Sequence, residues 1–130
     1  MITPTMAPRL SVLVVDDEPA MRELIWASLW KLGHSSETAP SAEAALEVFR
    51  PTKFDLVITD LYLPGINGHD LAHNIKRQDD KVPIILLTGY APSAPPSGID
   101  LVLTKPFGMK ALNKAIAKVA LQTSRRSTNR

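Results

Sequence analysis

Short apolar runs alternate with helical patterns along the whole chain. The runs comprise residues 10–15, 34–39, 54–59, 82–88 and 99–104. The second run is weak, whereas three of the others are almost continuous valine, isoleucine and leucine, as expected for strands that are covered on both faces. Strands that alternate with helices are typical of β-α-β units. The pattern therefore predicts an α/β fold with a doubly wound, five-stranded parallel sheet.

Four helices are predicted between and after these runs. Apolar residues recur at spacings of three and four in the segments 21–32, 42–49, 71–75 and 109–119. Pro19 suits the first turn of the first helix and Gly33 its end. Ser41 is a favourable N-cap for the second helix, which ends before Pro51.

The interval between the fourth and fifth runs is too short for a normal crossover helix. Residues 89–98 include Pro92, Pro95 and Pro96, and a crossover with its helix needs about 10 to 12 residues or more. Proline also removes a backbone donor from a helix interior. We therefore expect the helix at this place to be short or absent.

Composition fits one folded domain. The chain has 130 residues, of which 45% are hydrophobic and 22% are charged, and domains most often contain about 100 to 150 residues. The absence of cysteine excludes disulfides and thiolate metal sites. We expect residues 1–8 to form an N-terminal extension, residues 9–122 the domain, and residues 123–130 a basic, disordered tail.

The net charge of +2 arises from that tail, which carries Arg125, Arg126 and Arg130. Without these three arginines, the chain has 12 basic and 13 acidic side chains, which gives a net charge of −1. A nearly neutral domain gives little support to nucleic-acid binding, for which a basic face is expected. The apolar runs are far shorter than the roughly 20 residues that span a bilayer. We therefore expect a cytoplasmic protein that binds neither nucleic acid nor membrane.

Polar side chains follow four of the predicted strands, at the edge of the sheet where open α/β folds bind ligands. They are Asp16 and Asp17 after the first strand, Asp60 after the third, Thr88 after the fourth and Lys105 after the fifth. Neighbouring carboxylates repel one another by about 4 kcal/mol per pair at about 4 Å, so a cation is expected among them. Oxygen ligands suit Mg²⁺, and a lysine and a hydroxyl suit a phosphoryl group. The set predicts phosphoryl transfer to a carboxylate nucleophile.

Five segments resemble the receiver domains of two-component response regulators. They are LVVDDEP at 13–19, DLVITD at 55–60, LPGING at 63–68, LLTG at 86–89 and KPF at 105–107. The resemblance implies that Asp60 accepts a phosphoryl group from a phosphohistidine. It further implies that Asp17, Asp60 and the main-chain carbonyl of Tyr62 bind Mg²⁺ (or Mn²⁺) directly, and that Asp16 binds it through water.

The same resemblance implies that Thr88 and Lys105 bind phosphoryl oxygens and that the Lys105–Pro106 peptide bond is cis. The sheet would be flavodoxin-like, with strand order 2-1-3-4-5. The implied partners are a sensor or hybrid histidine kinase or a histidine phosphotransfer protein, and a downstream protein target. The domain would catalyse its own phosphorylation and dephosphorylation and would act on no external substrate. A stand-alone regulator and a receiver within a longer hybrid kinase both fit.

Two positions depart from the pattern of the family. Receivers usually carry an aromatic residue three positions before the conserved lysine, where this chain has Val102. The usual fourth helix is replaced by the proline-rich segment 91–98. Our hypothesis is that signalling relies on this segment or on another face.

Two other readings remain open. A pseudo-receiver would keep the fold without using phosphorylation; the five filled site positions argue against it and Val102 mildly for it. A haloacid dehalogenase-type hydrolase uses similar chemistry, but its nucleophile lies on the first strand with a second aspartate two residues later. Here Tyr62 stands two residues after Asp60, on the third predicted strand, and the chain has no cap domain.

Two further groups of polar residues are expected to be solvated. His69 and His73 have the spacing of a zinc-binding helix, but the apolar residues around them define a different, buried face. Lys110, Lys114 and Lys118 form a row on the last helix. A docking surface for an acidic partner is the alternative for that row.

Overall fold

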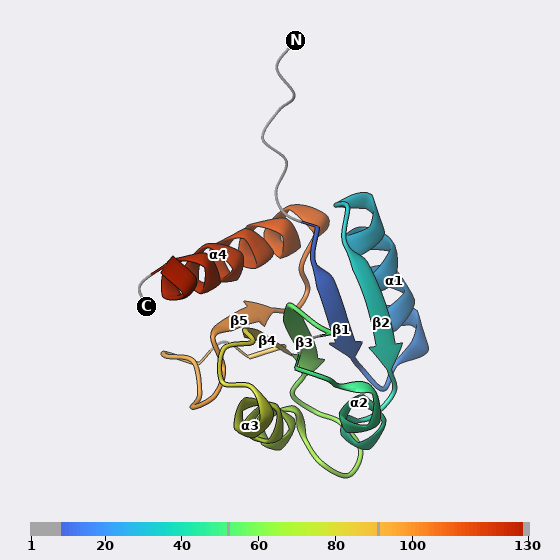
Figure 1. Cartoon of the computed structure of the whole chain (residues 1–130). Helices are drawn as coiled ribbons and strands as arrows, with labels where there is room; N and C mark the ends of the chain where they lie inside the picture. The colour runs from blue at the N-terminus through green and yellow to red at the C-terminus, as the bar shows by residue number, and fades with distance from the viewer. Residues whose placement is uncertain (1–8, 52, 91, 129–130) are drawn as a thin grey trace.

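The computed structural model describes residues 9–51, 53–90 and 92–128, with side chains as far as Leu121. These residues form five strands and four helices, which alternate except between the last two strands (Figure 1). They are β1 (Ser11–Val15), α1 (Pro19–Lys31), β2 (Ser35–Ala39), α2 (Ala42–Val48), β3 (Leu56–Asp60), α3 (Gly68–Gln78), β4 (Ile84–Thr88), β5 (Leu101–Thr104) and α4 (Met109–Thr128). All neighbouring strands are parallel, and their order β2-β1-β3-β4-β5 confirms the expected order.

Helices cover both faces of the sheet, which explains the continuous apolar runs. Leu13 and Val15 of β1 pack in one buried cluster with residues of α2 and α3. Val12 and Val14 point to the other face and pack with residues of α1 and α4. Figure 1 shows the two pairs of helices on opposite sides of the sheet. β3 and β4 are buried at every residue, because they have strands on both sides and helices on both faces.

The helix boundaries follow the local signals of the sequence. Pro19 begins α1, and Gly33 follows the helix with a φ of 93°, a conformation that favours glycine. The Ser41 hydroxyl accepts a hydrogen bond of 3.1 Å from the Ala44 N–H and so caps α2. The Asn67 side chain caps α3 in the same way.

No helix connects β4 to β5 in the described residues of the segment 89–100, which exclude residue 91. Ile99 is buried and packs in the cluster beneath α2 and α3. Its N–H donates a 3.0 Å hydrogen bond to the carbonyl of Pro96. The residue that follows the proline-rich segment therefore contributes an apolar side chain to the face that a fourth crossover helix would cover.

The two ends of the chain differ in what the structure describes. The expected N-terminal extension, residues 1–8, lies outside the described residues. α4 continues to Thr128, so the expected boundary between residues 122 and 123 falls inside this helix. None of the helices in the described part of the chain is long and apolar enough to cross a membrane.

A mostly buried ion pair links the start of β4 with the start of β5 through the end of α3. Lys76 Nζ lies 2.8 Å from Asp100 Oδ2 and donates a 2.7 Å hydrogen bond to the carbonyl of Val82. The same carboxylate oxygen accepts a 2.8 Å hydrogen bond from the Ile84 N–H. Asp100 thus satisfies a cation and a backbone donor at once.

We expect Asp100→Ala to lower the free energy of unfolding by about 2 to 4 kcal/mol, because it leaves a largely buried ammonium without its counter-charge and a backbone N–H without its acceptor. Urea denaturation measures this change. Glu37→Ala is the matched control, since Glu37 and Lys53 form a pair of similar length, 2.7 Å, with about half of each side chain exposed. That control should cost less than about 1 kcal/mol. Equal losses in the two variants would contradict the role of burial.

Candidate functional site

The parallel register brings the ends of β1, β3, β4 and β5 to one edge of the sheet. Asp60, the last residue of β3, pairs with Leu87 of β4. Thr88, the last residue of β4, pairs with Thr104 of β5, and its carbonyl accepts a 2.8 Å hydrogen bond from the Lys105 N–H. The residues that the sequence places at this edge are therefore neighbours in the structure.

Three carboxylates form an acidic cluster at this edge. One carboxylate oxygen from each of Asp16, Asp17 and Asp60 lies within 4.8 Å of the other two. Asp16 and Asp60 are buried, with exposed fractions of 1% and 8%, whereas Asp17 is exposed. The cluster offers only oxygen donors and has one side open to solvent, which suits a hard divalent cation that keeps some of its waters.

Asp16 carries the strongest electrostatic signal in the cluster. Its Oδ1 accepts a 2.8 Å hydrogen bond from the Glu18 N–H, but its buried Oδ2 has no hydrogen-bond partner. Burial raises the pKa of Asp16 above its ordinary value of 3.8, and the negative charges of Asp60 and Asp17 raise it further. The Glu18 N–H and the Lys105 ammonium act in the opposite direction without cancelling the shift. A buried carboxylate oxygen without a hydrogen-bond partner, such as Asp16 Oδ2, is suited to binding a cation.

Lys105 and Thr88 flank the acidic cluster from the other side. Lys105 Nζ lies 3.3 Å from Asp60 Oδ2 and 3.8 Å from Asp16 Oδ2, and about a quarter of its side chain is exposed. Thr88 is buried, and its hydroxyl oxygen accepts a 3.2 Å hydrogen bond from the Tyr90 N–H. Its hydroxyl proton is therefore free to be donated elsewhere. An ammonium therefore lies beside the Asp60 carboxylate, and a hydroxyl donor stands at the end of the neighbouring strand β4.

Gly68 holds the segment that follows Asp60. Its N–H donates a 2.8 Å hydrogen bond to the Leu61 carbonyl, and a Cβ at this position would collide with the main-chain carbonyl of Asp60. The sequence marks Gly68 only as a turn residue, and the close approach is visible only in the structure. Arg22 is a second residue that the sequence does not single out; its guanidinium donates a 2.6 Å hydrogen bond to the Asp16 carbonyl.

Comparison with known proteins decides the family. Residues 12–117 match the response regulator receiver domain, which is well over half of the chain. The chain belongs to this family.

Two curated relatives show the range of proteins in which such a receiver domain occurs. The present chain is 38% identical over 115 residues to the response regulator protein FleR of Pseudomonas aeruginosa, and the match covers 85% of this chain and 24% of FleR. It is 34% identical over 118 residues to the aerobic respiration control sensor protein ArcB of Escherichia coli, covering 85% of this chain and 15% of ArcB. The chain spans less than a quarter of the length of either relative.

A solved structure supports the comparison of the site. The response regulator TrrA of Thermotoga maritima, solved in complex with Mg²⁺-BeF, is 36% identical and superimposes with a TM-score of 0.77. The match covers 84% of this chain and 97% of that one. The two proteins therefore share the receiver fold.

Three other positions of the receiver domain can now be placed. The Lys105–Pro106 peptide bond is cis, the form that the resemblance implied. Tyr62, whose carbonyl is an expected metal ligand, has a side chain that is 76% exposed. Val102 is half-buried and packs against the cluster beneath α2 and α3. A short branched side chain in this place has no ring that could rotate between a buried and an exposed position.

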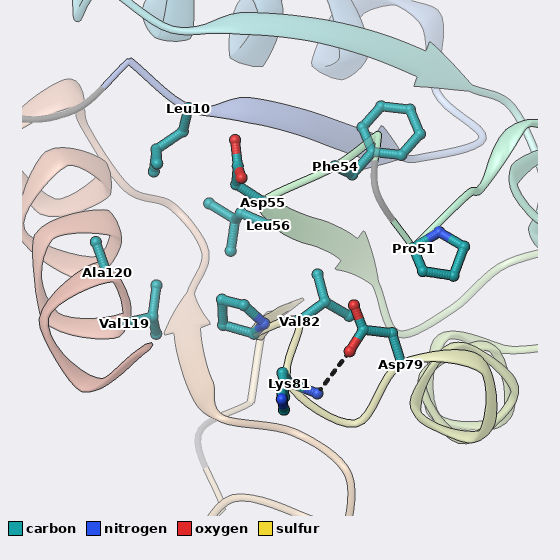
Figure 2. A pocket seen from close by; sticks show the side chains of 11 residues that line it. Leu10, Pro51, Phe54, Asp55, Leu56, Asp79, Lys81, Val82, Val119 and Ala120 are labelled. Carbon is teal, nitrogen blue, oxygen red and sulfur yellow. Dashed lines mark hydrogen bonds between the residues drawn. The ribbon is translucent and has the colours of Figure 1, made fainter. Parts of the chain in front are cut away.

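A separate cavity of about 310 Å³ lies at the opposite edge of the sheet, where the strands begin. Figure 2 shows that mostly apolar side chains line it, among them Leu10, Val82 and Val119. Its two carboxylates are already bound to the backbone: Asp55 accepts a hydrogen bond from the Ser11 N–H, and Asp79 accepts one from the Lys81 N–H. None of the acidic-cluster residues lines this cavity, so it takes no part in the site of the receiver domain.

We expect Asp16→Asn to stabilise the metal-free receiver domain at neutral pH by on the order of 1 kcal/mol. It removes a buried negative charge that is repelled by Asp60 and Asp17 and that the Lys105 ammonium, 3.8 Å away, offsets only in part. The pKa of Asp16 is raised on folding, so its stabilising contribution is complete below the unfolded value of 3.8 and is lost as the pH rises through the folded value. The difference in free energy of unfolding between Asp16→Asn and the wild type should therefore grow in favour of the variant from about pH 4 to about pH 7.

Urea denaturation of both proteins across this pH range, with and without Mg²⁺, measures the effect. Mg²⁺ should stabilise the wild type more than the variant and so narrow the difference at neutral pH. If the wild type is more stable than Asp16→Asn at neutral pH without metal, the buried charge of Asp16 does not destabilise the metal-free fold, and the prediction is wrong.

Proposed function

We propose that this receiver domain accepts a phosphoryl group from a partner's phosphohistidine onto Asp60, in a reaction that requires Mg²⁺. The observation that carries the proposal is the position of the Asp60 carboxylate: it is buried, held 3.3 Å from Lys105 Nζ, and surrounded by the other groups of the acidic cluster. The membership of the family and the Mg²⁺-BeF complex of TrrA support it.

In the proposed reaction a carboxylate oxygen of Asp60 attacks the phosphorus atom. The phosphorus–nitrogen bond of the phosphohistidine breaks, its electron pair returns to the imidazole, and an acyl phosphate forms on Asp60. The Lys105 ammonium then pairs with a phosphoryl oxygen in place of the free carboxylate, and the Thr88 hydroxyl donates to another. Attack of water on the same phosphorus atom reverses the modification.

Asp17, Asp60 and the Tyr62 carbonyl would hold the cation directly, and Asp16 would hold it through water. Mg²⁺ bound there neutralises charge that builds up on the phosphoryl oxygens during transfer. The orphaned Asp16 Oδ2 is the observation of this structure that fits such an ion. Because the phosphoryl group is transferred to Asp60 of the chain itself and hydrolysed from it there, the domain would modify no other molecule apart from its phosphoryl donor.

The proposed phosphoryl donors are a sensor or hybrid histidine kinase or a histidine phosphotransfer protein, and the signal passes to a downstream protein target in the cytoplasm. Relatives that are a response regulator and a sensor protein are consistent with either setting. A phosphorylation-independent interaction module is the outcome that the following experiments would favour if they fail.

Asp60→Ala should abolish phosphorylation while leaving the fold intact or slightly more stable, because one of three mutually repelling carboxylates is removed. Incubation with acetyl phosphate and Mg²⁺, followed by intact-mass measurement, should show one added phosphoryl group on the wild type and none on the variant. Asp17→Asn tests the metal site without removing the nucleophile, because Asp17 is a proposed metal ligand that does not attack phosphorus. This variant should be phosphorylated more slowly, and a higher Mg²⁺ concentration should partly restore the rate. Full phosphorylation of Asp60→Ala would remove Asp60 from its role.

Lys105→Ala should retain Mg²⁺ binding but lose most of the response to beryllofluoride, since the ammonium pairs with the phosphoryl group and not with the cation. Amide NMR during a titration with Mg²⁺ and then beryllofluoride measures both steps. Lys114→Ala, which removes an exposed lysine of α4, is the matched control and should respond as the wild type does. An unchanged beryllofluoride response in Lys105→Ala would show that this charge is not needed.

A further inference from the structure

Two histidines outside the acidic cluster converge on one backbone oxygen. His69 and His73 lie one turn apart on α3, and the Nε2 atom of each lies 3.1 Å from the carbonyl oxygen of Ser97. Their rings contact each other edge to face, with centroids 4.7 Å apart. His69 is half-buried and His73 is exposed. Both histidines lie outside the buried core, as expected, but their rings also contact the proline-rich segment.

The proline-rich segment is shaped to lie on these rings. Gly98, the residue after Ser97, has a φ of 83°, a conformation that L side chains rarely adopt. A Cβ on Gly98 would lie 3.2 Å from Cδ2 of His73, so the backbone approaches the imidazole closely. This arrangement places two imidazole nitrogens within 3.1 Å of one carbonyl oxygen.

The separations of these donors are close to those of a transition-metal site. Ligands at about 2.0 to 2.1 Å from a tetrahedral zinc ion lie about 3.3 to 3.4 Å from one another, and the two N···O separations here are 3.1 Å. Histidines at positions i and i+4 of a helix present their rings to the same side. Imidazole nitrogen suits zinc, copper and nickel, whereas the all-oxygen acidic cluster suits magnesium.

We propose that His69 Nε2, His73 Nε2 and the carbonyl oxygen of Ser97 form a binding site for a divalent transition-metal ion, with Zn²⁺ as the reference ion. Water completes the coordination. In the metal-free protein each Nε2–H donates to Ser97; when the ion binds, each neutral ring carries its proton on Nδ1 instead, so the proton count is unchanged. The ion would cross-link α3 to the segment that replaces the fourth helix. This site shares no ligand with the phosphoryl-transfer site proposed around Asp60, and the proposal does not rest on that function.

The third histidine of the chain provides an internal reference. His34 is buried, and its Nδ1 accepts a 3.1 Å hydrogen bond from the Leu10 N–H. It lies at the start of β2, outside the cluster formed by α3 and Ser97. Its resonances should not respond to an ion bound at the proposed site.

The test is a Zn²⁺ titration of the full chain in excess Mg²⁺, which competes for the acidic cluster, followed by calorimetry and by NMR of the imidazole rings and backbone carbonyls. We expect one Zn²⁺ per chain, with shifts of His69, His73 and the Ser97 carbonyl and none of His34. His69→Gln and His73→Gln should each weaken binding by at least about 10- to 100-fold, the range for loss of a supporting partner. Gln78→Ala, at the exposed end of α3, should bind as the wild type does.

Three results would overturn the proposal. They are the absence of Zn²⁺ binding, affinities in both histidine variants equal to that of the wild type, and shifts confined to the acidic cluster. A response of the two rings without one at the Ser97 carbonyl would refute the three-ligand site. Beryllofluoride binding in His73→Gln should remain normal, which separates failure of this site from failure of the proposed phosphoacceptor.

Discussion

The repulsion among three carboxylates at the carboxyl edge of the sheet is the constraint to which the surrounding structure responds. Burial of Asp16 and Asp60 strengthens that repulsion, because the local dielectric is lower than that of water. Lys105 compensates part of it through its contacts with both residues. One buried oxygen of Asp16 nevertheless keeps no hydrogen-bond partner. The metal-free fold therefore gives up stability at this edge, and any cation that binds there recovers it.

The parallel sheet makes such a cluster possible. β1 and β3 are hydrogen-bonded to neighbouring strands on both sides and covered by helices on both faces, so the backbone holds the buried Asp16 and Asp60 close together in spite of their repulsion. The close approach of Gly68 to the Asp60 carbonyl fixes the turn that follows β3. In this way the stability of the two buried clusters is used to hold an unfavourable arrangement of charges, as is common at functional sites.

The sequence predicts those features that depend on local signals, and it misses those that depend on contacts between distant segments. β3 and β4 are recognisable because every one of their residues is buried, whereas β2 is weak because most of its residues are at least partly exposed. The proline-rich segment is recognisable because proline excludes a helix. The contacts of His69 and His73 with Ser97 span 28 and 24 residues, and the Lys76–Asp100 pair spans 24. Nothing in the local pattern specifies which backbone atom a side chain will meet at such a distance.

The contacts of His69 and His73 with Ser97 link the Asp60 side of the site to the Lys105 side. This link does not involve position 102, where an aromatic residue is usual in the family. α3 begins against the Asp60 carbonyl and carries His69 and His73 onto the proline-rich segment. That segment continues into β5, which ends immediately before Lys105, and Lys105 returns to Asp60. The contacts therefore form a closed ring from the nucleophile through α3 and β5 and back to its cation. If a phosphoryl group on Asp60 disturbs these contacts, we expect the change to be expressed in the proline-rich segment, because it lies between the two ends of the ring. Val102 packs against the core and has no ring that could rotate.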